Sequence, residues 1–294
     1  MSGVRGLDTA VGLGRGEHGC WVYDGAEGVR PLLAAYLAEG MRLRERLLYV
    51  GAGPREVLVD ELTDLPGRDA LLREGVLGVC CFAELEVPVP TVDGVRAEPP
   101  AGTLPVVGPR LPAEAFRRFA TDAVAAGHVG LRLALDVTTL LAEGAITPRL
   151  VDAELAVATA FSVDHATALC LVDRSRAGSG ARVTARLHRI QHLEGVEPTF
   201  ALVPTPGVVH LVGEVDTTTA DDLGRALAAY ADATTGPLAL DLLDLDFIDV
   251  AATRALALFE RRMAAVGRSV SFAGVGPAAA TTLRAFALNG EGQP

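Results

Sequence analysis

Residues 241–256, DLLDLDFIDVAATRAL, contain the change from strand to helix that decides the fold of the second half of the chain. An apolar run ends in an acidic turn, and a helical pattern begins directly after it. Asp249 precedes the helical pattern and is suited to be its N-cap, because a carboxylate accepts hydrogen bonds from the free amides of the first turn. The stretch therefore predicts a buried strand, a short turn and a helix over 250–266.

The same alternation of strands and helices extends on both sides of this stretch. Strands are expected at 200–203, 208–214, 238–242 and 269–273, and helices at 217–232, 250–266 and 277–288. Asp216 or a neighbouring threonine is a candidate cap for the first of these helices. Two helices repeat apolar residues at i, i+3, i+7 and i+10, as helices lying on a sheet do. The expected buried stripes are Ala220, Leu223, Leu227 and Tyr230 in the first helix, and Leu256, Phe259, Met263 and Val266 in the second.

Residues 197–294 resemble the STAS family, whose name joins sulfate transporters and anti-sigma factor antagonists. The resemblance lies in the order β-β-α-β-α-β-α and in the stretches LVGEVDTTTADDL and ALDLLDLDFIDVAATRAL. In that family a serine after the F-(I/M)-D motif is phosphorylated by an anti-sigma kinase, and the helix that begins there docks onto the kinase. The resemblance implies a regulatory protein, similar to an anti-sigma factor antagonist, that binds an anti-sigma factor or a related protein.

The switch positions of this sequence differ from the family. Val250, Ala251, Ala252 and Thr253 stand where Ser, Ser, Gly and Leu are expected. Val250 has no hydroxyl group, so it cannot be phosphorylated. Thr253 is an alternative acceptor, although a local hydrogen bond in the first turn is a simpler role for it.

We expect the partner-binding residues to be Asp249, Val250, Ala251 and Thr253, without a phosphate gate. The other interpretation is that Asp249 and its acidic neighbours only cap a helix at a solvated sheet edge. The two interpretations differ in whether this region contacts another protein.

The first half of the chain predicts a parallel sheet that is covered on both faces. A proline-rich segment, 86–112, has no period and is expected to be a loop or an extended hairpin. The pattern restarts near 192–200, so we expect two domains, 1–192 and 193–294. Nearly continuous apolar strands, separated by helical patterns, are expected at 18–24, 46–51, 76–85, 129–137 and 166–173.

Four stretches of this half resemble the MEDS family, sensory domains first described in methanogens and methylotrophs. They are HGCWVYD (18–24), ERLLYV (45–50), AAGHVGLRLALDV (125–137) and ATALCLVDRSR (166–176), and their order and spacing carry the resemblance. It implies a sensory domain over about residues 10–192 with a reduced RecA-type core. The expected fold is thus α/β, with a RecA-like parallel-sheet domain followed by a STAS-type sheet with helices.

A small molecule would bind such a domain at the carboxyl ends of the strands. The candidate ligand-binding residues are His18, Asp24, Gly25, Gly28 and Asp136. His18 and Asp24 stand at opposite ends of one strand, so they cannot share a site unless a loop folds between them. Asp136 can instead cap the turn that follows its strand.

The nucleotide-binding parts of a RecA-type ATPase are missing. YDGAEGVRPLL (23–33) holds glycines but no GK[ST], and the chain contains no lysine. No GxSxG or similar context supports a nucleophilic site. His188 and His192 have the spacing of metal ligands on a helix, but no third ligand is evident nearby. We expect no enzymatic activity, no cofactor and no metal.

Composition limits the possible partners and the compartment. A net charge of -11 without a basic run argues against nucleic acid, and the apolar runs are too short for a membrane span. Cysteines in apolar stretches, with no CxxC and no targeting segment, indicate a reduced cytoplasmic protein.

The sequence thus predicts a bacterial, cytoplasmic regulator of transcription in which a MEDS-like sensor controls a STAS domain. The alternatives are a small-molecule sensor or scaffold and a degenerate nucleotide-binding protein. A ligand of the first domain and assembly into homo-oligomers both stay open.

Overall fold

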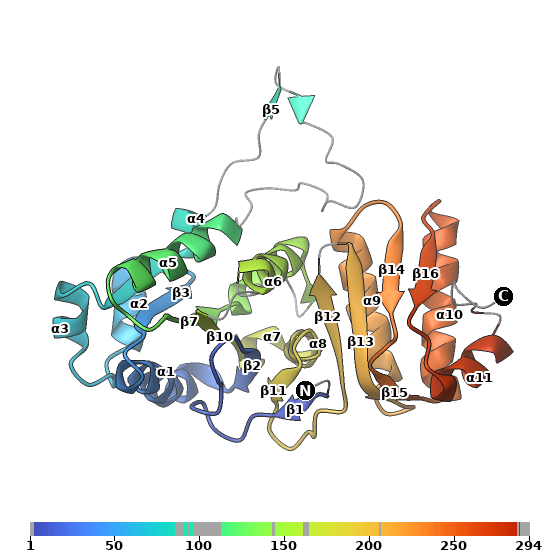
Figure 1. The fold of residues 1–294 in the computed structure, drawn as a ribbon, viewed down its shortest axis with the longest axis horizontal. Coiled ribbons are helices and arrows are strands. Elements are labelled where there is room, and N and C mark those ends of the chain that lie inside the picture. The colour runs from blue at the N-terminus through green and yellow to red at the C-terminus, as the bar shows by residue number, and fades with distance from the viewer. Residues whose placement is uncertain are drawn as a thin grey trace.

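A parallel sheet dominates the first half of the chain, and a mixed sheet dominates the second half (Figure 1). The computed structural model describes residues 3–85, 91–92, 95–96, 113–142, 145–160, 165–205, 207–286 and 288. Among these residues, none of the helices has both the length and the apolar character required to cross a membrane. The expected α/β class is confirmed.

The first sheet has seven strands, and every pairing in it is parallel. Its order is β1 (Arg5–Gly6), β11 (Ile190–His192), β2 (His18–Tyr23), β10 (Ala166–Asp173), β7 (Leu131–Asp136), β3 (Arg46–Gly51) and β4 (Leu77–Cys81).

Helices cover both faces of this sheet, which explains its nearly continuous apolar strands. Leu133 and Leu135 of β7 belong to one core, and Ala134 between them belongs to the other. One face packs against α1 (Gly25–Arg42), α2 (Arg55–Glu61) and α3 (Arg68–Arg73), and the other against α5 (Ala113–Ala125), α6 (Pro148–Ala160) and α8 (Ser179–Ala185).

Short elements fill the connections, and one of them corrects the sequence analysis. The strand expected at 76–85 ends at Cys81, and a short helix, α4 (Phe82–Leu85), replaces its last residues. In the proline-rich segment, β5 (Thr91–Val92) and β6 (Val95–Arg96) pair in antiparallel fashion, and the rest of 86–112 lies outside the described residues. The other short elements are η1 (Thr138–Leu140), β8 (Leu141–Ala142), β9 (Ala145–Ile146) and α7 (Arg174–Ala177).

The second sheet is mixed. β12 (Phe200–Thr205) and β13 (Val208–Val215) form an antiparallel pair, and β14 (Leu238–Asp241) and β16 (Val270–Ala273) continue the sheet in parallel. A strand that the sequence analysis missed, β15 (Leu245–Ile248), pairs with the end of β13. Its helices are α9 (Ala220–Ala233), α10 (Val250–Ala265) and α11 (Pro277–Ala285).

The expected helical stripes are buried, with one exception. Val266 is 66% exposed, because α10 ends at Ala265 and Val266 lies past its last turn. Thr219, one of the threonines expected to cap α9, is its N-cap residue, but its side chain makes no capping hydrogen bond. Asp216, the other candidate, accepts a hydrogen bond from the amide of Thr218 in the turn before the helix.

Two helices of the first half, α6 and α8, lie against the second sheet and its helix α9 (Figure 1). Val151 of α6 and Val183 of α8 belong to the core of the second half, whereas Ala153 and Ala181 belong to a core of the first. The expected boundary at 192/193 falls between β11 and β12. It stays a prediction, because α6 and α8 contribute to the cores on both sides of it.

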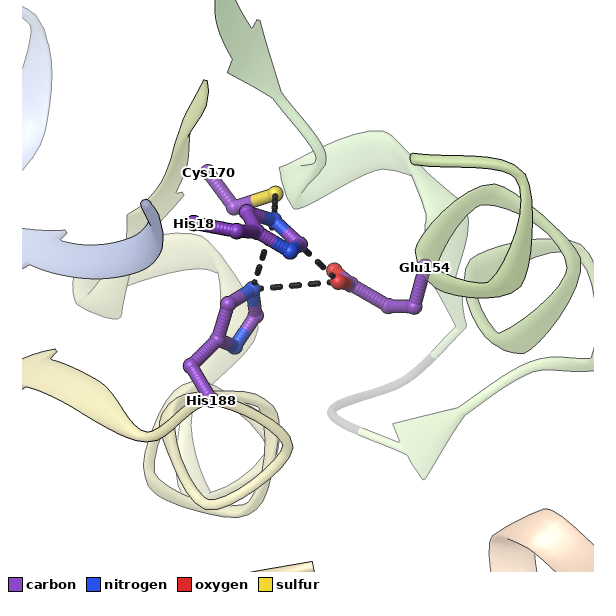
Figure 2. Close-up of side chains that lie close together, drawn as sticks. All are labelled: His18, Glu154, Cys170 and His188. Carbon is purple, nitrogen blue, oxygen red and sulfur yellow. Dashed lines mark hydrogen bonds and ion pairs between the residues drawn. The ribbon is translucent and has the colours of Figure 1, made fainter. Parts of the chain in front are cut away.

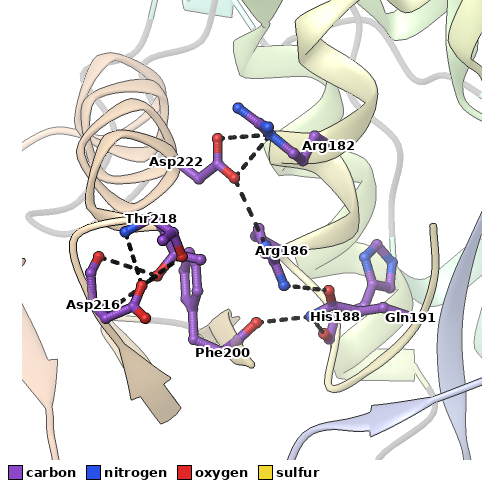
Figure 3. A network of polar contacts seen from close by, with 9 residues as sticks. Arg182, Arg186, His188, Gln191, Phe200, Asp216, Thr218 and Asp222 are labelled. Atoms are coloured by element: carbon purple, nitrogen blue, oxygen red, sulfur yellow. Dashed lines mark hydrogen bonds and ion pairs between the residues drawn. The ribbon is translucent and has the colours of Figure 1, made fainter. Parts of the chain in front are cut away.

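Polar side chains join the same two halves (Figure 3). The Nε atom of Arg182 lies 2.9 Å from the carboxylate of Asp222 on α9, and the Nε atom of Arg186 lies 3.9 Å from it. Gln191 accepts a hydrogen bond from Arg186 and donates one to the carbonyl of Phe200 on β12. Burial lowers the pKa of Arg186, although Asp222 opposes this effect. The network links α8 to the second half by charge as well as by packing.

Candidate functional site

The start of α10 is fixed by Asp249, as the sequence predicts. Its Oδ1 atom accepts a hydrogen bond from the amide of Ala252 at 2.8 Å. Its backbone N–H donates to the carbonyl of Val215 at 3.2 Å, which ties the helix start to the end of β13. The helix therefore begins at a defined point, directly after β15.

Thr253 lies beneath the surface and not on the expected partner-binding face. Its side chain is 0% exposed, and its hydroxyl donates to the carbonyl of Asp249 at 2.8 Å. The local role that the sequence analysis considered for Thr253 is confirmed. A kinase could reach this hydroxyl only if the first turn of α10 unfolded.

The exposed side of α10 carries apolar residues. Val250 is 63% exposed and Leu258 is 55% exposed, and Arg254 is exposed between them. These residues are spaced at i, i+4 and i+8, so they lie along one side of the helix. Ala251 is half-buried beside them. We call the side formed by Val250, Ala251, Arg254 and Leu258 the α10 face.

A groove of about 620 Å³ runs between this face and the start of α9. On the α9 side, Asp216 accepts hydrogen bonds from the amide and hydroxyl of Thr218, which hold the turn before α9, and the side-chain bond holds the pKa of Asp216 below its usual value. Apolar, acidic and basic side chains all contribute to the opening. The groove is lined by Thr217, Ala220, Asp221, Asp249, Val250, Ala251, Arg254, Ala255 and Leu258.

Residues 199–290, which include the groove and the α10 face, match the family described as "Mlab, STAS domain". This segment is a STAS domain. Among solved structures, a variant of RsbS from Moorella thermoacetica is similar at 21% identity, over 31% of this chain and 80% of its own, with a TM-score of 0.26. That likeness is too weak to support an inference about function. No curated protein matches the sequence.

Outside the STAS domain, the structure brings together Asp24, Gly25 and Asp136 at the carboxyl ends of the strands, but other groups of the chain already engage them. Asp24 pairs with Arg174, and the amide of Gly25 donates to Asp173 at 3.0 Å. Asp136 accepts from the hydroxyl of Tyr23 at 2.7 Å.

A ligand at this edge would have to displace some of these bonds. Asp136 also accepts from the amide of Thr138 at 3.0 Å, so it caps the following turn, which is the alternative that the sequence analysis left open. An anion at the start of α1 would replace the carboxylate of Asp173. Gly28 lies in the first turns of α1, and its nearest neighbouring side chain is that of Tyr23.

His18 lies at the other end of β2, away from these residues, in a separate buried group (Figure 2). It meets Glu154, Cys170 and His188 there, with the Nε2 atoms of the two histidines 3.2 Å apart. Burial, helped by His188 and opposed by Glu154, lowers the pKa of His18 to about 3. The ring is therefore neutral near pH 7.

His188 and His192 do not share a helix, so the spacing noted in the sequence does not bring them together as metal ligands. His192 is in β11, where its ring stacks on Trp21 with the centroids 3.6 Å apart. The sequence analysis also missed Glu154 and Cys170. A signal for Glu154 existed: it stands four residues after Leu150 and three before Val157, which places it on an apolar side of its helix.

Proposed function

We propose that the chain is a regulatory protein similar to an anti-sigma factor antagonist, whose STAS domain binds an anti-sigma factor through the α10 face. One observation carries the proposal: the position of the phosphorylated serine is held by Val250, an exposed apolar side chain at the rim of the groove. A solvated helix cap would not need an apolar side chain there, whereas a protein interface would use one.

The charge around Val250 explains why a phosphate would matter at this position. The carboxylates of Asp249 and Asp221 line the same groove. A negative charge at 250 would therefore add to existing negative charge, and it would have to be desolvated when a partner covered the groove. Because Val250 carries no hydroxyl and Thr253 is buried, the α10 face stays competent to bind in the folded protein.

Control would then come from the first half of the chain, which we propose to be a MEDS-like sensor. The start of α9 suggests the route. Asp222 bonds to Arg182 of α8 (Figure 3). Ala220 and Asp221, the two residues before it, line the groove. A ligand that moved α8 would act on the wall of the groove through α9.

The test is titration calorimetry of the full chain against purified anti-sigma kinases from the same cell. Wild-type protein is expected to bind one of them, and Val250→Glu is expected to lower the affinity by at least about tenfold, since about 1.4 kcal/mol suffices for that change. Val266→Glu is the matched control, because Val266 is similarly exposed just past the far end of α10. Its affinity should equal that of wild type.

Two outcomes would contradict the proposal. If none of the kinases binds, the partner is wrong. If one binds but Val250→Glu and Val266→Glu have the same affinity, the partner is right and the docking surface lies elsewhere.

The buried group around His18 favours a second candidate, a sensor of a small ligand whose STAS domain assembles it with other proteins. Both candidates place the protein in the cytoplasm of a bacterium, without enzymatic activity. They differ in whether the partner of the α10 face is an anti-sigma factor, which the same titration decides.

A further inference from the structure

Four side chains from distant parts of the sequence meet inside the first half of the chain (Figure 2). His18 begins β2, Cys170 is in the adjacent strand β10, Glu154 is on α6, and His188 follows α8. One ligand atom from each lies within 4.8 Å of those from the other three. We call these four residues the His–Glu–Cys cluster.

The surroundings of this cluster are apolar. Ala153, Val157 and Ala181 of the helices and Val172 of the sheet belong to the core that contains Cys170. Glu154 is 2% exposed, and its carboxylate faces Nε2 of His188 at 3.0 Å and Nε2 of His18 at 3.6 Å. Burying a carboxylate costs several kcal/mol unless a positive charge or hydrogen-bond donors lie beside it. A cation between these groups would offset that cost.

The Nε2 atoms of both histidine rings point to the centre of the cluster. Nδ1 of His188 lies 3.1 Å from the carbonyl of Thr184, which can only accept, so this nitrogen carries the proton. In the neutral ring, Nε2 of His188 is then unprotonated. That atom lies 3.0 Å from a Glu154 oxygen and 3.2 Å from Nε2 of His18. A backbone carbonyl that fixes the tautomer in this way is typical of a histidine that binds a metal.

The distances between the ligand atoms match those around a small tetrahedral ion. Zinc holds nitrogen and oxygen at about 2.0–2.2 Å and sulfur at about 2.3 Å, so neighbouring ligand atoms are about 3.3–3.7 Å apart. Here Nε2 of His18 lies 3.2 Å from Sγ of Cys170 and 3.6 Å from a Glu154 oxygen. The four ligand atoms all lie within 4.8 Å of one another, so the wider pairs would have to close by up to about 1 Å around an ion.

We propose that His18, Glu154, Cys170 and His188 form a binding site for a divalent transition-metal ion, and that zinc fits it best. The carboxylate and the thiolate together balance the two charges of the ion. Thiolate and imidazole ligands favour zinc and its neighbours over magnesium and calcium, which prefer oxygen. On binding, the thiol proton of Cys170 is released to solvent.

The competing explanation is a buried ion pair without metal, in which a doubly protonated His188 donates to Glu154. That pair would account for two of the four residues. Without a metal, Nε2 of His18 and Sγ of Cys170, which are 3.2 Å apart, would share a weak S–H···N hydrogen bond beside that pair. The two explanations differ in whether the wild-type chain takes up a metal.

The first experiment uses the wild-type full chain. Chelator-treated protein is titrated with Co²⁺, which replaces zinc and reports its ligands by absorption. We expect one ion per chain, visible bands of a tetrahedral cobalt site and a near-ultraviolet band from a thiolate ligand, all of which excess Zn²⁺ should bleach. The absence of saturable binding, or an octahedral spectrum without the thiolate band, would overturn the proposal in favour of the ion pair.

The second experiment assigns the ligands. Glu154→Gln and Cys170→Ala are each expected to weaken Zn²⁺ binding by at least about 100-fold, as removal of a group that holds a metal does. The matched control is Cys20→Ala, since Cys20 is buried opposite Cys170 on the neighbouring strand but is not one of the four residues. Circular dichroism shows whether each variant folds.

The outcomes of these variants are distinct. Unchanged zinc affinity in folded Glu154→Gln and Cys170→Ala would overturn the assignment. If either variant does not fold, the Co²⁺ spectrum of Cys20→Ala decides the assignment. A spectrum that keeps the thiolate band supports Cys170 as the sulfur ligand. A spectrum that loses the band contradicts it. Metal is measured on the chain alone, so this proposal can fail or succeed independently of partner binding by the STAS domain.

Discussion

The His–Glu–Cys cluster and the α10 face depart from the usual partition of side chains in opposite directions. The cluster buries ionisable groups in an apolar core, whereas the α10 face exposes Val250 and Leu258 to water. Both arrangements are unfavourable for an isolated soluble fold, because polar groups prefer water and large apolar groups prefer the interior. The comparison teaches that both exceptions fit the components that we propose for them, a cation in the buried region and a protein partner on the exposed one.

The largest effect is expected in the buried charge network between α8 and α9. Asp222→Ala should lower the free energy of unfolding by about 3–5 kcal/mol, because it leaves the buried guanidinium of Arg186 without its carboxylate. Urea unfolding of the full chain measures this change. Asp221→Ala is the control, since Asp221 is the exposed neighbour, and its effect should stay within about 0.5 kcal/mol. Equal losses of stability in the two variants would contradict the expectation that the buried carboxylate contributes more than the exposed one.

The next largest effect separates the two sides of α10. Leu256→Ala should cost about 2–5 kcal/mol of stability, because Leu256 is fully buried and its removal leaves a cavity. Leu258→Ala, two residues along the same helix, should change stability by less than about 0.5 kcal/mol and should weaken partner binding. A large loss of stability in Leu258→Ala would mean that the α10 face packs within the chain, and the comparison would then fail.

The smallest effect concerns the helix cap. Asp249→Ala should cost about 1 kcal/mol, because the amide of Ala252 loses its acceptor. Asp246→Ala is the control: Asp246 is exposed on the preceding strand, and its replacement should be nearly neutral. Thermal unfolding followed by circular dichroism distinguishes the two variants. If both are neutral, Asp249 is free to serve the partner and does not hold the helix start.

The α10 site could be predicted from the sequence because its residues are neighbours in the chain. Asp249, Val250 and Ala251 belong to one strand–turn–helix motif, whose local pattern also gives the cap. The burial of the Thr253 side chain is harder to predict from the sequence. Position four of a helix lies over the first turn, and only the packing of α10 on the sheet shows that this side is the buried one.

The His–Glu–Cys cluster could not be predicted in the same way. His18 and Cys170 are 152 residues apart, and they meet because β2 and β10 are neighbours in the sheet. The sequence indicates that both strands exist but not their order. His188 depends further on how the chain turns after α8, a short helix that the sequence analysis did not predict.

The placement of α6 has a consequence for how the protein melts. Leu150 and Val157 of this helix pack on the first half and Val151 on the second, so neither half can release α6 without exposing apolar surface of the other. Heating should therefore produce one calorimetric transition that involves the entire chain. A fragment cut between β11 and β12 would expose the apolar surface that α6 and α8 now cover, and it would aggregate more readily than the intact protein.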